Sequence, residues 1–296
     1  MAIRVGRGWR DYILTAFSGA ADGLPPWVQD FENGDDAGYF GRGSAVWHVH
    51  GGTAVIVAGV RALLMQTLHP GAMAGVHDWS RYREDPLGRL AGTVRWVLTT
   101  TFADRAGADA GSAFVRTLHT RVRGTYGDDV PYSAADPDLL RWVHIVFEEA
   151  FLSCHQAWGS PIPGGADEYV AEWAIAGELM EVASPPRSEA ELRAQLSAFD
   201  SQLVSDERVA AAVSFIRTPP LARSLMPGYR IIFAGAVATL EPKYRRMLGL
   251  RTPWFGAKVT TRIALRLLAL LLGRPSTAET YAGRRLARLE GDSPVG

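Results

Sequence analysis

The sequence predicts an all-α protein, and three observations lead to this prediction. Apolar residues recur at spacings of three and four along most of the chain, which is the period of a helix. An acidic residue followed by proline opens two of these patterns, and proline is favoured at the first position of a helix. No run of alternating apolar and polar residues lies between Asn-Gly or Asp-Gly turns. With 296 residues the chain can bury a sizeable core without cross-links, and we expect one main helical bundle.

The helices are predicted in the following order. The first runs from about residue 44 to 68, with Val57, Val60 and Leu64 on one side, and Pro70 stops it. Glu84-Asp85-Pro86 opens the second, which extends to about residue 102. A third covers about 111–123, and Asp136-Pro137 opens a fourth that extends to about residue 158. Further helical patterns cover 167–183, 188–203 (with Ser188 and Glu191 as a capping box), 206–217, 228–250, 258–272 and 276–290.

The charges balance over the whole chain but not along it. Lys plus Arg equal Asp plus Glu at 31 each, which argues against a nucleic-acid-binding protein. Residues 241–296 carry 11 basic and 4 acidic side chains, so the rest of the chain is net acidic. We expect the basic end to pack on the acidic body, and the alternative is a peripheral contact with an anionic membrane. Neither the first twenty residues nor the apolar run at 262–272 suggests a signal or spanning segment, so a cytoplasmic protein is expected, peripheral to the membrane in the alternative.

Several kinds of site are excluded by missing motifs. A single cysteine, Cys154, rules out disulfide frameworks and Cys-ligated clusters, and its apolar neighbours predict a small core residue. The chain contains no His-Glu-x-x-His, no Glu-x-x-His, no glycine-rich nucleotide loop and no Gly-x-Ser-x-Gly elbow. All seven histidines lie between residues 48 and 155. His144 and Glu148 share a helix face, for which a hydrogen bond or solvent pairing is favoured over metal binding.

The arrangement with most chemical content is Arg89 and Thr93 on one helix and His119 on the next. Residues four apart on a helix project from one face, so Arg89 and Thr93 lie a turn apart. A cation and a hydroxyl facing an imidazole would suit an anionic planar cofactor such as haem, whose propionate the arginine could pair. The alternative is an ordinary salt bridge and a threonine bonded back to a helix carbonyl.

A longer pattern of residues extends along the chain from Arg61 to His144. Its members are Arg61 through His69-Pro70-Gly71, Gly75-Val76, Asp85-Pro86, Arg89-Leu90, Thr93, His119, Gly124, Tyr132-Ser133-Ala134, Asp136-Pro137 and Trp142-Val143-His144. In these residues the chain resembles the mpaB/rubber-oxygenase catalytic-domain family, which includes latex-clearing proteins. The resemblance covers roughly residues 45–250 and implies a single globin-like helical bundle that encloses a b-type haem. The chain is then expected to divide into an N-terminal extension (1–44), this haem domain (45–250) and a basic C-terminal helical tail (251–296) packed on it.

The resemblance also implies roles for individual residues. Arg89 and Thr93 match the family's Arg-x-x-x-Thr pair near the haem, and His119 matches the proximal iron ligand. His69 and His144 match positions typical of the wider family and are haem-pocket candidates, with capping or interhelical hydrogen bonds as the alternative. Gly92 stands where latex-clearing proteins have lysine, and the glutamate proposed there as a base has no counterpart near Met73.

The expected function is that of a haem b-dependent oxygenase, an oxidoreductase. With one imidazole ligand, haem iron keeps a position open for O₂ or peroxide. The substrate class implied by the resemblance is hydrophobic, an isoprenoid or another lipid-like molecule. Two alternatives remain at this stage: a haem sensor or carrier without turnover, and a helical scaffold with a vestigial pocket.

Overall fold

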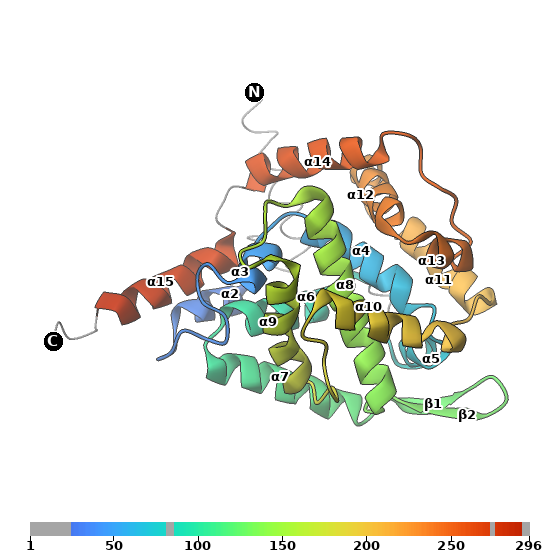
Figure 1. Ribbon diagram of the computed structural model, residues 1–296, viewed down its shortest axis with the longest axis horizontal. Helices are drawn as coiled ribbons and strands as arrows, with labels where there is room; N and C mark the ends of the chain where they lie inside the picture. Colours follow the sequence, from blue (N-terminus) through green and yellow to red (C-terminus); the bar gives the residue numbers. More distant parts are fainter. Residues whose placement is uncertain (1–24, 81–85, 273–275, 292–296) are drawn as a thin grey trace.

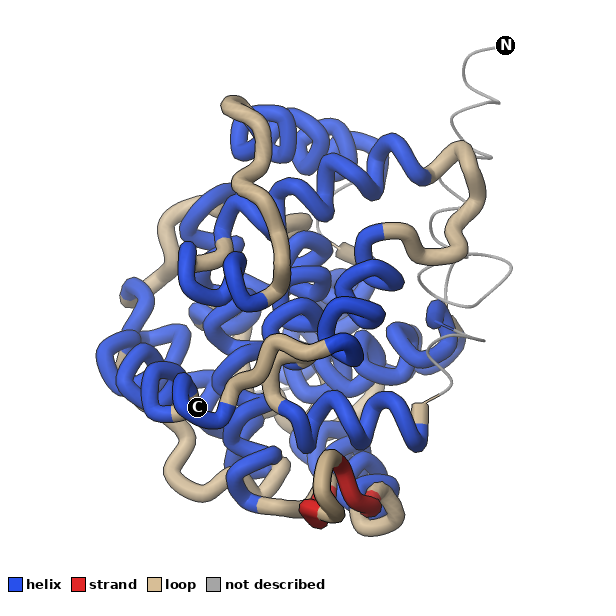
Figure 2. The backbone as a smooth tube through the Cα atoms, turned by 90° about the vertical axis from the view of Figure 1, so that its right-hand side faces the viewer, coloured by secondary structure: helices blue, strands red, loops and turns tan. Residues whose placement is uncertain are grey.

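The protein is mostly helical, which confirms the predicted all-α class. The computed structural model describes residues 25–80, 86–272 and 276–291, without the side chains of residues 86–90, 271 and 272. A single antiparallel pair of short strands is the only sheet in these ranges (Figures 1 and 2). The helices are α2 (Pro26–Gln29), α3 (Ala45–His50), α4 (Val55–Gln66), α5 (Pro70–Trp79), α6 (Pro86–Phe102), α7 (Arg105–His119), α8 (Pro137–Trp158), α9 (Gly165–Leu179), α10 (Glu189–Ala198), α11 (Glu207–Arg217), α12 (Met226–Thr239), α13 (Pro242–Met247), α14 (Ala257–Leu272) and α15 (Thr277–Gly291), with 3₁₀ turns η1 (Asp30–Glu32) and η2 (Asp200–Gln202).

The centre of the molecule is the packed pair α4 and α8. Helix α8 runs through the middle of the bundle, where α4, α9, α10 and α12 contact it (Figure 1). Trp142 and Ile145 of α8 and Leu64 of α4 are fully buried and belong to the main hydrophobic core. A buried ion pair crosses the same contact: Arg61 Nε donates to Glu149 Oε2 at 3.1 Å.

The structure describes one of the two predicted helix starts with an acidic residue before proline completely, and the other only in part. Asp136 accepts hydrogen bonds from the N–H groups of Asp138 and Leu139 and caps α8, so this predicted start is confirmed. Helix α6 begins at Pro86 and ends at Phe102, as predicted, while Glu84 and Asp85 lie outside the described residues. Ser188 caps α10 through the N–H of Glu191, and the Glu191 carboxylate accepts from the N–H of Arg187.

Two predicted helices are each broken into two. The pattern over 44–68 forms α3 and α4, because Gly51 and Gly52 make a turn between them. Gly51 has a packing role there: a Cβ at this position would lie 2.4 Å from a carboxylate oxygen of Glu279. The pattern over 228–250 forms α12 and α13, because Pro242 lacks the N–H that a continuous helix would need. Because the apolar periodicity continues across both breaks, the sequence pattern predicted a single helix in each case.

The region after α6 also differs from the prediction. Helix α7 covers Arg105–His119 instead of 111–123, because the Asp104 side chain caps it at the N–H of Gly107. The chain then forms the hairpin of β1 (Arg123–Tyr126) and β2 (Val130–Ser133), which the sequence did not predict. Its loop needs left-handed backbone at Gly127 and Asp129, and its largely exposed strands lack the alternation that marks a half-buried sheet. Helix α5 was also missed, since its ten residues follow His69-Pro70 directly.

The two ends of the described chain lie together. Helix α15 contacts η1 and α2, and the buried Arg285 guanidinium donates to the carbonyl oxygens of Phe31 at 2.7 Å and Phe102 at 2.9 Å. Arg284 pairs with Glu32 at 3.1 Å on the surface beside it. The contact therefore joins the N-terminal segment, α15 and the end of α6. No helix in the described residues is long and apolar enough to cross a bilayer.

Candidate functional site

The predicted site residues Arg89, Thr93 and His119 lie on the antiparallel helices α6 and α7. The two helices are joined by Ala103 and Asp104 alone, and they pack along their length. Trp96 Nε1 of α6 donates to Ser112 Oγ of α7 at 3.1 Å, which fixes their register. Because both helices rise equally per residue, Arg89, seven positions before Trp96, lies level with His119, seven positions after Ser112. The structure thus brings the backbone of Arg89 to the level of His119.

The pair on α6 is only partly described. Arg89 and Thr93 share a helix face, as predicted, because they are four residues apart within one continuous helix. The Thr93 side chain is exposed, and the Arg89 side chain lies outside the described residues. The face of α6 that carries both residues is therefore accessible to solvent at Thr93.

His119 is the last residue of α7 and is half-buried. Its Nδ1 is buried and has no hydrogen-bond partner among the described residues. Burial lowers the pKa of His119, because desolvation disfavours the charged imidazolium. The ring is therefore neutral at pH 7, which is the form that binds iron.

His144 and Glu148 form a second polar group, on α8. His144 Nε2 and Glu148 Oε2 are 3.7 Å apart, which is too long for a hydrogen bond, and both side chains are buried. The prediction that this pair forms a hydrogen bond or pairs with solvent is therefore wrong. Both oxygens of Glu148 lack partners in the described residues, and burial raises the pKa of Glu148 well above its ordinary value. Burial lowers the pKa of His144 to about 4. Burial therefore favours the neutral form of both groups.

The helices that carry His119 and His144 meet the same end of α9. Arg116, three residues before His119, donates to the Leu179 carbonyl and pairs with Glu181 at 3.1 Å. The His144 ring packs against Gly177, where an added Cβ would lie 2.9 Å from His144 Cε1. Helices α7 and α8 thus both meet the last turn of α9. The sequence singled out His144, but Glu148 carried no signal beyond its position one turn later in an apolar helix.

An aromatic wall lies beside this group, built from α3, α8 and α9. Trp173 of α9 packs edge-on against His50 with ring centroids 4.4 Å apart, and Phe147 and Phe151 of α8 stack with centroids 4.1 Å apart. His50 Nδ1 is 2.8 Å from Thr101 Oγ1 and its Nε2 is 3.1 Å from Tyr169 OH, so both ring nitrogens are engaged. Burial lowers the pKa of His50 to about 3. His50 is therefore a neutral core residue.

His69 lies elsewhere. It precedes α5 as its N-cap residue, with ring centroids 5.9 Å from Trp142 and 6.0 Å from Phe199. Its Nε2 is 3.3 Å from Gln202 Oε1. Trp142 and His144 are two residues apart on α8 and point in directions about 200° apart. The contact with Trp142 therefore puts His69 on the side of α8 opposite His144, and the structure does not bring these two candidates together.

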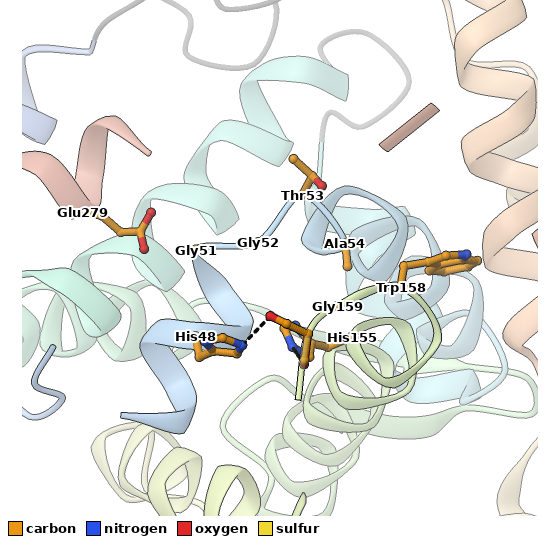
Figure 3. A pocket seen from close by; sticks show the side chains of 10 residues that line it. His48, Gly51, Gly52, Thr53, Ala54, His155, Trp158, Gly159 and Glu279 are labelled. Carbon is orange, nitrogen blue, oxygen red and sulfur yellow. Dashed lines mark hydrogen bonds between the residues drawn. The ribbon is translucent and has the colours of Figure 1, made fainter. Parts of the chain in front are cut away.

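A small polar cleft lies at another corner of the molecule, where the turn between α3 and α4 meets the end of α8 and the start of α15 (Figure 3). His48 Nε2 is 2.8 Å from Ser160 Oγ, and His155 Nε2 is 2.9 Å from the Ser160 carbonyl oxygen. The cleft holds about 130 Å³. Pockets for larger ligands span roughly 300 to 1,000 Å³, so this cleft suits only a small molecule or water.

The donor that the structure describes here, the imidazole of His119, is of the kind that haem iron binds. The described residues contain no group of three or more His, Cys, Asp or Glu side chains that could hold a metal ion. Haem iron takes four ligands from the porphyrin and needs only one imidazole from the protein. His119 offers a buried nitrogen that has no hydrogen-bond partner among the described residues.

Comparison with known protein families identifies a relationship over most of the chain. The family model described as ER-bound oxygenase mpaB/B'/Rubber oxygenase, catalytic domain, matches residues 47–274. The match extends from α3 through α14 and so includes α6 to α9, which carry the groups described above. No curated protein and no solved structure matches the chain.

Proposed function

The chain belongs to the mpaB/rubber oxygenase catalytic-domain family, as its sequence predicted, and from this membership we propose a haem b-dependent oxygenase that acts on a hydrophobic substrate. The family supports oxygenase-type activity. The observation that carries the haem assignment is the placement of His119 level with Arg89, with a buried Nδ1 that has no partner among the described residues.

The residues have separate roles in this proposal. His119 ligates the iron as a neutral imidazole, while Arg89 pairs with a propionate and Thr93 lies beside it on the same face. When bound, haem supplies an iron with an open position for O₂ or peroxide. Glu148 keeps a proton at its carboxyl because burial raises its pKa, so it is a proton donor that the chain itself provides. The aromatic side chains around Trp173 pack into an apolar wall, and the substrate class that we propose from the family is an isoprenoid or other lipid-like molecule.

The test of the cofactor is the absorption spectrum of the protein expressed with haem supplied, before and after reduction with dithionite. We expect a Soret band in the wild type and at least about a tenfold loss of bound haem in His119→Ala. His77→Ala is the matched control, because His77 is an exposed histidine whose Nδ1 contacts Asp78 at 3.0 Å. A wild type without a Soret band, or a His119→Ala spectrum equal to the wild type, contradicts the proposal.

The second candidate is a haem sensor or carrier without turnover. Two differences from latex-clearing proteins favour the sensor or carrier. Gly92 stands where those proteins have lysine, and no glutamate lies near the buried Met73 in the sequence, where the resemblance leads one to expect the catalytic base. Oxygen consumption with candidate alkenes separates the two functions. Product formation supports the oxygenase, while stable haem binding with no product supports the sensor or carrier.

A further inference from the structure

Exposed apolar side chains are concentrated on one surface of the molecule. Of the eleven large apolar residues that are exposed in the described part of the chain, six lie between residues 254 and 270. Leu270 is 81% exposed, and Phe255, in the loop before α14, is fully exposed. Contiguous apolar surface of this kind marks an interaction site. We call these six residues the α14 surface: Trp254, Phe255, Val259, Ile263, Leu267 and Leu270.

Helix α14 has three distinct faces. Its buried face, at Ala257, Thr261 and Leu265, packs on α12, where Thr261 Oγ1 donates to the Ile231 carbonyl at 3.2 Å. The four apolar residues of the α14 surface that lie in the helix follow one another at spacings of four, four and three, so they share a second face. Helix α14 lies along the outer edge of the bundle, at the top of Figure 1.

The third face of α14 is cationic. Lys258, Arg262 and Arg266 are exposed and each precedes an apolar member of the α14 surface by one residue, so a basic stripe borders the apolar one. The surrounding sequence has the same sign: residues 242–278 carry eight Lys and Arg and no Asp or Glu. A helix with an apolar face, a basic border and neighbouring aromatic residues is typical of segments that lie in the interface of an anionic membrane.

Other occupants fit this surface less well. A symmetric contact with a second copy would place Lys258, Arg262 and Arg266 near their own counterparts, with no acidic residue of 242–278 to offset them. Residues 1–24 carry three arginines and two aspartates, so they offer no net negative charge either. A bilayer that contains anionic lipid complements both the basic and the apolar stripes.

We propose that the α14 surface docks the protein peripherally on anionic lipid bilayers. Trp254, Phe255 and the apolar face of α14 enter the interface, while Lys258 and Arg266 contact lipid phosphates. With 16 residues, α14 is about 24 Å long and lies along the membrane rather than through it. This docking does not depend on haem, so it stands or fails separately from the proposed function.

The first test is sedimentation of the full-length protein with vesicles of 30% phosphatidylglycerol and 70% phosphatidylcholine, compared with pure phosphatidylcholine. At 50 mM salt we expect binding to the anionic vesicles to exceed binding to the neutral ones by about tenfold or more. Raising the salt to 500 mM lowers the binding, since the Debye length shortens. No binding to anionic vesicles at 50 mM salt, or equal binding to both kinds, overturns the proposal.

Matched variants assign the binding to the surface. Leu267→Gln with Leu270→Gln removes apolar contact at nearly constant helix propensity and lowers partitioning about tenfold. Phe114→Gln is its control, since Phe114 is a 65% exposed residue of helix α7. Lys258→Glu lowers binding to anionic vesicles about tenfold, while Arg208→Glu, the same change of charge on α11, leaves it unchanged.

Two other results also decide the matter. In the first, light scattering shows dimers of the wild type but not of the Leu267→Gln, Leu270→Gln variant, and the wild type does not bind vesicles. The α14 surface then binds a second copy of the chain, and the lipid proposal is wrong. A monomer whose binding is equal in the wild type and in that variant uses another surface, which also overturns it.

Discussion

The burial of Glu148 strongly affects the protonation of its carboxyl group. It lies on α8 one turn after His144, fully buried, with both oxygens lacking partners in the described residues. Ionising it there would leave a charge without compensation, and so its pKa is raised well above the ordinary value of 4.5. The folded state therefore binds this proton at pH values where the unfolded chain has released it.

We predict that Glu148→Gln makes the protein more stable at neutral pH. Above pH 4.5 the unfolded wild type releases the proton that the folded state keeps, so its stability falls as the pH rises toward the folded-state pKa. Between pH 4.5 and the folded-state pKa of Glu148, the advantage of the variant grows by about 1.4 kcal/mol per pH unit. Urea unfolding at pH 4.5, 6 and 7.5 measures it. An advantage equal at all three values would contradict the assignment, and the exposed Glu207→Gln serves as control.

For single residues, the sequence predicted which side chains are buried or share a helix face better than it predicted what packs against them. Cys154 is a buried core residue, as its apolar neighbours predicted. The spacing of His144 and Glu148 correctly placed them on one face, but it could not say that the face is buried against α9. That depends on packing between segments distant in sequence, which no local pattern encodes. Likewise, the alignment of Arg89 with His119 required the register of α6 and α7, which Trp96 and Ser112 set.

At the level of helices, one glycine in α9 determines how closely α8 packs. Gly177 is buried, and an added Cβ would lie 2.9 Å from both His144 Cε1 and Pro185 Cβ. Gly92 of α6 gives the opposite case, because nothing lies within 4 Å of a Cβ there. The two positions share residue type and helical setting but differ in available space.

We predict opposite effects of the same substitution at these positions. Gly177→Ala destabilises the fold by about 1 to 3 kcal/mol, because the methyl group must displace His144 or Pro185. Gly92→Ala stabilises it by about 0.5 to 1 kcal/mol through helix propensity. Thermal or urea unfolding of both variants checks this. Equal changes in the two would mean that the space beside Gly177 does not matter.

Helix starts marked in the sequence by a predicted capping residue were predicted best, and the breaks within helical patterns were predicted worst. Asp136-Pro137 and Ser188 cap their helices through their own side chains, which is a local effect that a short stretch of sequence contains. The turn at Gly51 and Gly52 reflects instead the approach of Glu279, more than two hundred residues away. The hairpin of β1 and β2 was missed because its strands are mostly exposed and its loop does not use Asn-Gly or Asp-Gly.

At the scale of the whole molecule, Arg285 holds the two ends of the described chain together. Its guanidinium is buried and donates to the carbonyl oxygens of Phe31, Ala37 and Phe102, which belong to two distant segments. Arg284, its neighbour, is exposed and pairs only at the surface with Glu32. The two arginines differ in burial, and hence in their contributions to stability.

We predict that Arg285→Met destabilises the protein by about 3 kcal/mol or more, because it leaves buried carbonyl groups without donors. Arg284→Met changes the stability by less than about 1 kcal/mol, since an exposed ion pair contributes little. The midpoints of urea unfolding for the two variants measure the difference. A small effect of Arg285→Met would show that the contact of α15 with η1 and α6 does not support the fold.

The same contact has a consequence for how the protein is made in the cell. Arg285 and Phe31 are 254 residues apart, and the last carbonyl of α6 is satisfied by the same side chain. A ribosome adds residues one at a time, so the N-terminal segment and the end of α6 leave the exit tunnel long before α15 exists. This corner of the molecule can therefore close only after α15 has been synthesised.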